Sequence, residues 1–212
     1  MTRQERDARE TLPTKPLIGL AGGIGSGKTT VASMLKELGA AVISSDALNR
    51  EVLETPEVRR AIGQWWGVLH TDGSVDRAAL RRVISSDPEA RRRLEQLTHP
   101  LVAERRLALT AQYAADPQTR AIVWDSPLLF EVGLADACDA VIFVEADESV
   151  RRERVARERG WSPEELRRLE ETQKPLDFKR ASADYRVVNN SDRDALRSQV
   201  ERVFSQILSG SQ

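Results

Sequence analysis

A glycine-rich segment near the start of the chain has the residue types and spacing of a phosphate-binding loop. Residues Gly22 to Thr29 read GGIGSGKT and fit the pattern G-x-x-x-x-G-K-[ST]. Such a loop presents many backbone N–H donors with little side-chain bulk at a helix N-terminus, where Lys28 reaches the β- and γ-phosphates and the Thr29 hydroxyl binds Mg²⁺. The pattern predicts binding of ATP with Mg²⁺, through Gly23, Ile24, Gly25, Ser26, Gly27, Lys28, Thr29 and Thr30.

The segments on either side of the loop have the periodicity that this motif requires. Leu17–Ala21 is a short apolar run, and Thr29–Leu38 carries its apolar residues at helical spacing before Gly39. The sequence therefore predicts strand, glycine loop and helix. No Asn-Lys-x-Asp segment of the kind that reads guanine in GTPases occurs, and the chain is short for a motor ATPase. These features favour a kinase.

Asp46 is the first candidate for acid–base chemistry. It follows Ala40–Ile43, an apolar run that predicts a second buried strand ending near Ser44. Ligands of open α/β folds bind outside the carboxyl ends of the strands, and a carboxylate there can orient an acceptor hydroxyl and take its proton. Asp46 also precedes Ala47 and could cap a helix. The two roles are compatible, and the pattern leaves both open.

Asp125 is a second acidic residue at the end of an apolar run, 121–125. This is the position of a Walker B-like acid, which could hold Mg²⁺ or its water. The alternative is that Asp125 caps the segment Pro127 to Glu131. Both interpretations remain open.

The densest run of positive charge follows the apolar run 140–144. Guanidinium groups at this place could close over a triphosphate and stabilise the charge that develops in the transition state. The alternative is a solvated helix face with Glu153 and Glu158 as partners, so we expect only one or two of these arginines to touch the nucleotide. The run comprises Arg151, Arg152, Arg154, Arg157 and Arg159. A net charge of −1 and only 5% aromatic residues argue against a nucleic-acid partner.

Strands that alternate with helices predict a P-loop three-layer α/β/α fold with a five-stranded parallel sheet. The three further strands are expected at 121–125, 140–144 and 185–189. Residues from about 55 to 118 are mostly helical in pattern and predict a helical insert, in which Pro100 breaks or kinks a helix.

Helix start signals punctuate the insert and the second half of the chain. Asp87 precedes Pro88 in an N-cap pattern, Ser162 opens a capping box, and Asp192 can cap the last helix. A lid is expected over about 151–175.

Length and composition set the remaining bounds. The 212 residues suit one α/β domain, expected over 17–212, behind a loosely ordered polar tail over 1–16. Cys138 is the single cysteine, which excludes an intramolecular disulfide. Neither a membrane-spanning run nor the apolar part of a signal peptide is found, so we expect a cytoplasmic protein with no membrane partner, as a monomer or weak homo-oligomer.

Several blocks, taken in order, give the chain a resemblance to the dephospho-coenzyme A kinases. The resemblance covers about Leu17 to Leu208. It rests on Gly22–Val31, Val42–Asp46 with Arg50, Asp72–Arg81, His99–Leu101, Pro127–Glu131 and Ala183–Asn190.

The resemblance implies transfer of the γ-phosphoryl group of MgATP to the 3′-hydroxyl of dephospho-CoA. It implies that Asp46 is the catalytic acid at the acceptor hydroxyl, and that the insert receives the CoA moiety. The other residues that it implies are Arg50, His99 and Pro127 on the acceptor side, Arg154 and Arg157 in the lid, and Asn190 near adenine. The alternatives are a P-loop kinase for another small hydroxyl acceptor and a non-catalytic module that senses ATP.

Overall fold

The computed structural model describes residues 15–190 and 192–210. The chain divides into two compact units. The first unit is built from the segment that ends at Ser44 and the segment that begins at Thr110, and it contains the sheet. The second unit is Ser45–Leu109 and is helical.

A five-stranded parallel sheet forms the centre of the first unit, in the order β2-β3-β1-β4-β5. The α/β class and the parallel sheet expected from the sequence are therefore confirmed. Every expected strand is present, with ends that differ from the expected ones by at most one residue. The strands are β1 (Leu17–Gly22), β2 (Ala40–Ser44), β3 (Ala121–Asp125), β4 (Ala140–Glu145) and β5 (Tyr185–Val188).

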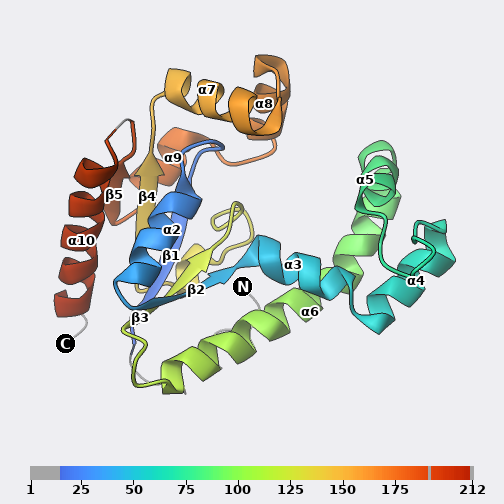
Figure 1. The fold of residues 1–212 in the computed structure, drawn as a ribbon, viewed down its shortest axis with the longest axis horizontal. Helices are drawn as coiled ribbons and strands as arrows, with labels where there is room; N and C mark the ends of the chain where they lie inside the picture. Colours follow the sequence, from blue (N-terminus) through green and yellow to red (C-terminus); the bar gives the residue numbers. More distant parts are fainter. Residues whose placement is uncertain (1–14, 191, 211–212) are drawn as a thin grey trace. The chain divides into compact units, whose positions relative to one another are not determined.

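Two helices, α2 (Lys28–Glu37) and α10 (Arg193–Gly210), cover one face of the sheet (Figure 1). Alternate residues of a strand point to the same face, so Ile18 and Leu20 of β1 pack with them. On the other face, Gly19 lies so close to Leu129 that a Cβ would come within 2.8 Å of that side chain. The core thus fixes β1, and with it the loop that follows.

The remaining elements of this unit come between β3 and β4 or between β4 and β5 along the chain. They are the short 3₁₀ helix η1 (Ala135–Ala137) and the helices α7 (Glu148–Arg159), α8 (Pro163–Glu170) and α9 (Leu176–Ala181). Figure 1 shows α7 and α8 beyond the carboxyl ends of the strands. The capping box at Ser162 is confirmed, because its hydroxyl accepts from Glu165 N and the Glu165 carboxylate accepts from Ser162 N.

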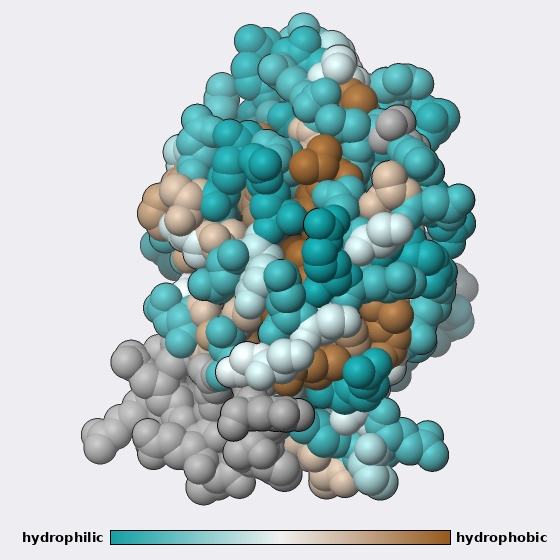
Figure 2. Space-filling view, turned by 90° about the vertical axis from the view of Figure 1, so that its left-hand side faces the viewer, coloured by the Kyte–Doolittle hydropathy of each residue, from teal (hydrophilic) through white to brown (hydrophobic). Residues whose placement is uncertain are grey.

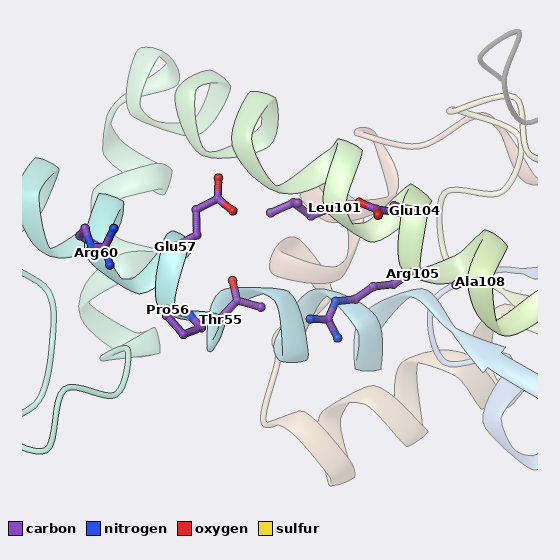
Figure 3. A pocket seen from close by; sticks show the side chains of 8 residues that line it. All are labelled: Thr55, Pro56, Glu57, Arg60, Leu101, Glu104, Arg105 and Ala108. Atoms are coloured by element: carbon purple, nitrogen blue, oxygen red, sulfur yellow. The ribbon is translucent and has the colours of Figure 1, made fainter.

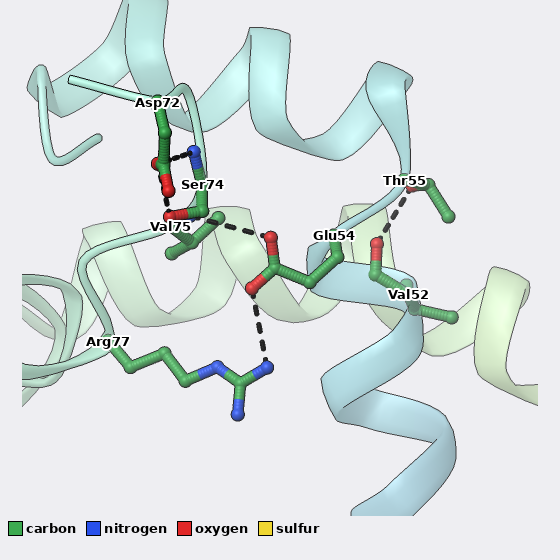
Figure 4. Close-up of polar contacts among 7 residues, drawn as sticks. All are labelled: Val52, Glu54, Thr55, Asp72, Ser74, Val75 and Arg77. Atoms are coloured by element: carbon green, nitrogen blue, oxygen red, sulfur yellow. Dashed lines mark hydrogen bonds and ion pairs between the residues drawn. The ribbon is translucent and has the colours of Figure 1, made fainter. Parts of the chain in front are cut away.

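The second unit consists of α3 (Ser45–Leu53), α4 (Pro56–Trp66), α5 (Arg77–Ser86) and most of α6 (Pro88–Ala115). Its own apolar core is built from Val52, Leu53, Val58, Ile62, Val75, Leu80 and Leu94. Figure 4 shows how Glu54 ties the end of α3 to the start of α5, through an ion pair with Arg77 at 3.3 Å. The expected helical character is confirmed here.

The sequence predicted a break or a kink at Pro100; the break is wrong, because α6 continues through this residue from Pro88 to Ala115. Proline removes one backbone donor, yet the flanking turns carry Leu94, Leu97, Leu101 and Val102 into the core of the unit. Packing of this face outweighs the lost hydrogen bond. The Asp87 N-cap is confirmed, since its carboxylate accepts from Glu89 N and Ala90 N.

Most of the tail expected over 1–16 lies outside the described residues, and its last two residues are held. Lys15 Nζ donates to the carbonyls of Tyr113, at 3.2 Å, and Asp116, while the Pro16 carbonyl accepts from Ile122 N at 2.9 Å. Within the described residues, no helix is long and apolar enough to cross a membrane. Figure 2 shows a face on which hydrophilic residues predominate, as the 31% of charged residues would suggest.

Candidate active site

The glycine loop lies between β1 and α2, where the motif requires it. Gly25 and Gly27 have φ angles of 77° and 86°, in the left-handed region that glycine enters without a steric penalty. Gly27 has a second constraint, because a Cβ there would lie 2.2 Å from Asn189 Nδ2. The sequence pattern of this loop is therefore explained by its backbone.

Side chains from α7 and the end of β5 bind the carbonyl groups of the loop. Arg151 Nη1 donates to the Ile24 carbonyl at 3.2 Å. The Ser26 carbonyl accepts from Asn189 Nδ2 at 2.8 Å and from Arg154 Nη1 at 3.4 Å. The C=O and the next N–H of a trans peptide point in opposite directions, so these contacts turn the N–H groups of Gly25 and Gly27 the other way.

These N–H groups are available to a ligand. Among the described residues, the backbone N–H groups of Ile24, Gly25, Gly27 and Thr29 donate to no acceptor. Donors left over at a helix N-terminus attract anions, since they combine hydrogen bonding with the helix dipole. Lys28 Nζ donates to the Gly22 carbonyl at 3.3 Å, which keeps its ammonium group beside the loop. The arrangement can bind a polyphosphate.

The arginine run of α7 separates into two groups. Arg151 is buried and pairs with Glu170 of α8, and Arg154 Nη2 donates to Asn189 Oδ1 at 3.3 Å. Arg157 instead pairs with the exposed Glu158 at 3.2 Å. Arg152 pairs with Glu148, and Arg159 stacks over the Trp161 ring at 4.8 Å. The structure thus brings Arg151 and Arg154 to the loop.

Asn189 and Arg151 contact the loop although the sequence pattern did not single them out for that role. Asn190, expected near adenine, accepts from Asp147 N at 2.8 Å with its side-chain oxygen, at the start of α7. Asn189 reaches Ser26, which is 163 residues away in the chain. The only local signal was a polar pair directly after an apolar strand.

Asp125 and Thr29 are the residues that the sequence predicted as Mg²⁺ ligands. Asp125 ends β3 and is in register with Leu20 of β1 and Ser44 of β2, at the carboxyl edge of the sheet. Thr29 is exposed in the first turn of α2. Within the described residues, no group of three or more His, Cys, Asp or Glu side chains could hold a metal. A site with only one or two protein ligands is typical of Mg²⁺, because this ion keeps several waters and binds substrate phosphates.

Pro127 lies two residues past the end of β3, in the turn that leads to Glu131. Residues 127–131 form turns rather than a regular helix. Whether Asp125 caps this segment stays a prediction beside its role as a metal ligand.

The acceptor-side candidates Asp46, Arg50 and His99 belong to the second unit. Asp46 is in the first turn of α3, and Arg50 follows four residues later on the same helix face. His99 is exposed on α6. Asp46 and Arg50 are exposed as well, so solvent reaches all three side chains.

An open pocket of about 650 Å³ lies in the same unit (Figure 3). Its lining mixes two arginines and two glutamates with apolar side chains, and comes from the α3–α4 connection, α4 and α6. The lining residues are Thr55, Pro56, Glu57, Arg60, Leu101, Glu104, Arg105 and Ala108. His99 does not line it.

The parallel sheet and the glycine loop at its carboxyl edge define a nucleotide-binding protein of the P-loop class. The chain belongs to the dephospho-CoA kinase family, because the model of that family matches residues 16–195. It is 42% identical over 202 residues to a dephospho-CoA kinase of Anaeromyxobacter dehalogenans, with 92% of this chain and 93% of that protein covered. A relative of the same name from Syntrophotalea carbinolica is 39% identical over 200 residues, with 92% and 93% covered.

Solved structures show the same fold. The crystal structure of TT1252 from Thermus thermophilus is 32% identical, with a TM-score of 0.76 and coverage of 91% of this chain and 97% of that one. The dephospho-CoA kinase of Campylobacter jejuni has the same fold, with a TM-score of 0.70 at 22% identity over 93% of this chain and 100% of that one. The family resemblance inferred from the sequence is confirmed.

Proposed function

We propose that this protein transfers the γ-phosphoryl group of ATP to the 3′-hydroxyl of the ribose in dephospho-CoA, giving CoA and ADP in the last step of CoA biosynthesis. Membership of the dephospho-CoA kinase family supports the reaction. The observation that carries ATP binding is the hydrogen bonding of the glycine loop. Its carbonyl groups accept from Arg151, Arg154 and Asn189, while its N–H groups are available to a ligand.

Asp46 is the proposed catalytic acid–base residue. The acceptor oxygen forms a bond to the γ-phosphorus as the bond from that phosphorus to the ADP oxygen breaks, and the hydroxyl proton passes to the Asp46 carboxylate. Asp46 lies in the first turn of α3, two residues after β2, and its exposed carboxylate is accessible to an acceptor hydroxyl, which suits this role. Arg50, four residues on, is proposed to bind the acceptor.

Thr29 and Asp125 are the proposed Mg²⁺ ligands, directly or through water. A bound ion would supply positive charge that neutralises the phosphates. Lys28, the residue before Thr29, is proposed to bind the β- and γ-phosphates. The first turn of α2 thus supplies both cationic binding and the metal-binding hydroxyl.

The remaining roles follow the family. Arg154 and Arg157, within a lid over about 151–175, are proposed to stabilise charge on the transferred group, and Asn190 to lie near adenine. His99 and Pro127 are proposed to contact dephospho-CoA, with the insert at about 55–118 as its receiving region. We further propose a cytoplasmic monomer or weak homo-oligomer with no nucleic-acid partner.

A coupled assay of ADP release with a panel of acceptors tests this function. Dephospho-CoA should give turnover that depends on its concentration, while adenosine and shikimate should give only background. Turnover with a different acceptor would reassign the substrate. Nucleotide binding without turnover of any acceptor would instead indicate an ATP-sensing module.

A further inference from the structure

Asn189 has a place in the fold that neither its residue type nor the family roles above explain. It is 8% exposed, and its backbone N–H donates to the Glu145 carbonyl at 2.8 Å, which ties it to the end of β4. Its side-chain amide is directed at the glycine loop rather than at solvent. Both of its polar side-chain atoms have partners: Nδ2 donates to the Ser26 carbonyl at 2.8 Å, and Oδ1 accepts from Arg154 Nη2 at 3.3 Å.

Arg154 closes this arrangement into a ring of hydrogen bonds. One guanidinium nitrogen, Nη2, donates to Asn189, and the other, Nη1, donates to the same Ser26 carbonyl at 3.4 Å. The amide donates to the carbonyl through its nitrogen and accepts from the guanidinium through its oxygen at once. A carboxylate of the same shape could only accept.

The peptide bond from Ser26 to Gly27 connects this ring to the ligand side of the loop. Its carbonyl is held by two donors, so its N–H, on Gly27, points the opposite way. Gly27 has a φ of 86°. Glycine adopts positive and negative φ values about equally readily, so the loop backbone alone does not fix the direction of the Gly27 N–H. A Cβ on Gly27 would lie 2.2 Å from Asn189 Nδ2, so the amide packs directly against the glycine.

We infer that Asn189 is a positioning residue that orients the Gly27 N–H toward the β-phosphate of a bound nucleotide. The inference rests on the proposed nucleotide site but not on the identity of the acceptor. Asn189 touches no reacting atom; it acts through the loop backbone. Both ADP and ATP carry the β-phosphate, so Asn189 contributes equally to the affinity for each.

The test is the dissociation constant of Mg-ADP and of Mg-ATP, measured by calorimetry on the full chain without an acceptor. Asn189→Asp keeps the shape and the acceptor for Arg154 but removes the donor to Ser26. Asn189→Ser shortens the side chain so that it loses the contact without adding charge, which serves if the aspartate variant folds poorly. Both variants should bind ADP and ATP about tenfold more weakly, because the hydrogen bond from the Gly27 N–H to a charged phosphate is misdirected. At saturating ATP, kcat should change by less than about threefold while KM for ATP rises.

Gln199→Glu is the matched control. Gln199 Nε2 donates to the carbonyl of Val188, the neighbour of Asn189, at 3.1 Å, and its Oε1 accepts from Val188 N at 2.9 Å. The variant removes the same kind of amide donor from the adjacent peptide without touching the loop. Its ADP affinity should stay within about twofold of the parent.

Three results would overturn the inference. The first is parental ADP affinity in a folded Asn189 variant. The second is an equal loss in Gln199→Glu, since that would show a general loosening of β5. The third is a loss of affinity for ATP with the affinity for ADP unchanged, which would place the effect at the γ-phosphate. If the parent binds ADP and the variants do not, the inference stands even where dephospho-CoA gives no turnover.

Discussion

Glu131 and Lys179 form an ion pair at 2.8 Å, with the lysine side chain 2% exposed and the glutamate 15%. The pair joins the turn after β3 to helix α9. Lys179 Nζ also donates to Gln173 Oε1 at 2.9 Å, and Glu131 accepts from Lys174 N at 2.8 Å. The return segment from the expected lid is thereby anchored beside the sheet.

Removing the negative charge of this pair should destabilise the protein strongly. Glu131→Gln leaves the buried Lys179 ammonium without its counter-charge, and we expect a loss of about 3–5 kcal/mol in the free energy of unfolding. Denaturant titration measures it. The control is Glu95→Gln, which breaks the exposed pair with Arg91 at 2.8 Å and should cost less than about 0.5 kcal/mol. Equal effects in the two variants would contradict the role given to burial.

The same pair predicts a dependence of stability on acid. Burial alone would raise the pKa of Glu131, but hydrogen bonds from the Lys179 side chain and Lys174 N–H outweigh it and lower the pKa below its ordinary 4.5. Because the folded pKa is the lower one, the contribution to stability is full above pH 4.5 and disappears as the pH falls through the folded value. As the pH falls from 7 to 3, the free energy of unfolding should decrease less steeply in Glu131→Gln than in the parent. Parallel decreases in the two proteins would argue against Glu131 as the source of the acid dependence.

Gly27 should tolerate no side chain. In Gly27→Ala the methyl group would overlap Asn189 Nδ2, and the φ of 86° would itself cost about 1–2 kcal/mol. We expect ADP affinity to fall by at least tenfold as the loop shifts. Gly67→Ala is matched for backbone strain, with a φ of 64° but nothing within 4 Å of the new methyl, and should lose stability while binding ADP normally. Normal ADP binding by Gly27→Ala would show that the loop can relax around it.

The sequence predicted the sheet well because its strands are encoded locally. Each strand is a short apolar run between turn residues, and the helix caps at Asp87 and Ser162 depend on neighbours two or three residues away. The break predicted at Pro100 was wrong because the local effect of proline is outweighed by the packing of a long helix against residues elsewhere in the unit. Periodicity cannot weigh that competition.

The candidate site was predicted in part for a related reason. The glycine loop carries its chemistry within eight residues, so GGIGSGKT was enough to locate it. The partners of its carbonyls come from α7 and the end of β5, which the sheet order brings to β1 through β4. β5 was expected to include Asn189 but ends at Val188, and the next residue turns its side chain to Ser26 instead. No spacing in the sequence encodes a contact over 163 residues.

Asp46 should be needed for turnover far more than for nucleotide binding. Asn in its place keeps the shape and can still hydrogen-bond an acceptor hydroxyl, but it cannot take the proton, so kcat with dephospho-CoA should fall by about 10²–10⁴. ADP affinity should remain within about twofold, because the group acts mainly in the transition state. Glu51→Gln is the control on the same helix, since Glu51 is also acidic and exposed and lies 3.9 Å from Arg105. It should retain most of the parental kcat. Near-parental turnover in Asp46→Asn would remove Asp46 as the base, whereas equal losses in both variants would point to the charge of α3 rather than to one carboxylate.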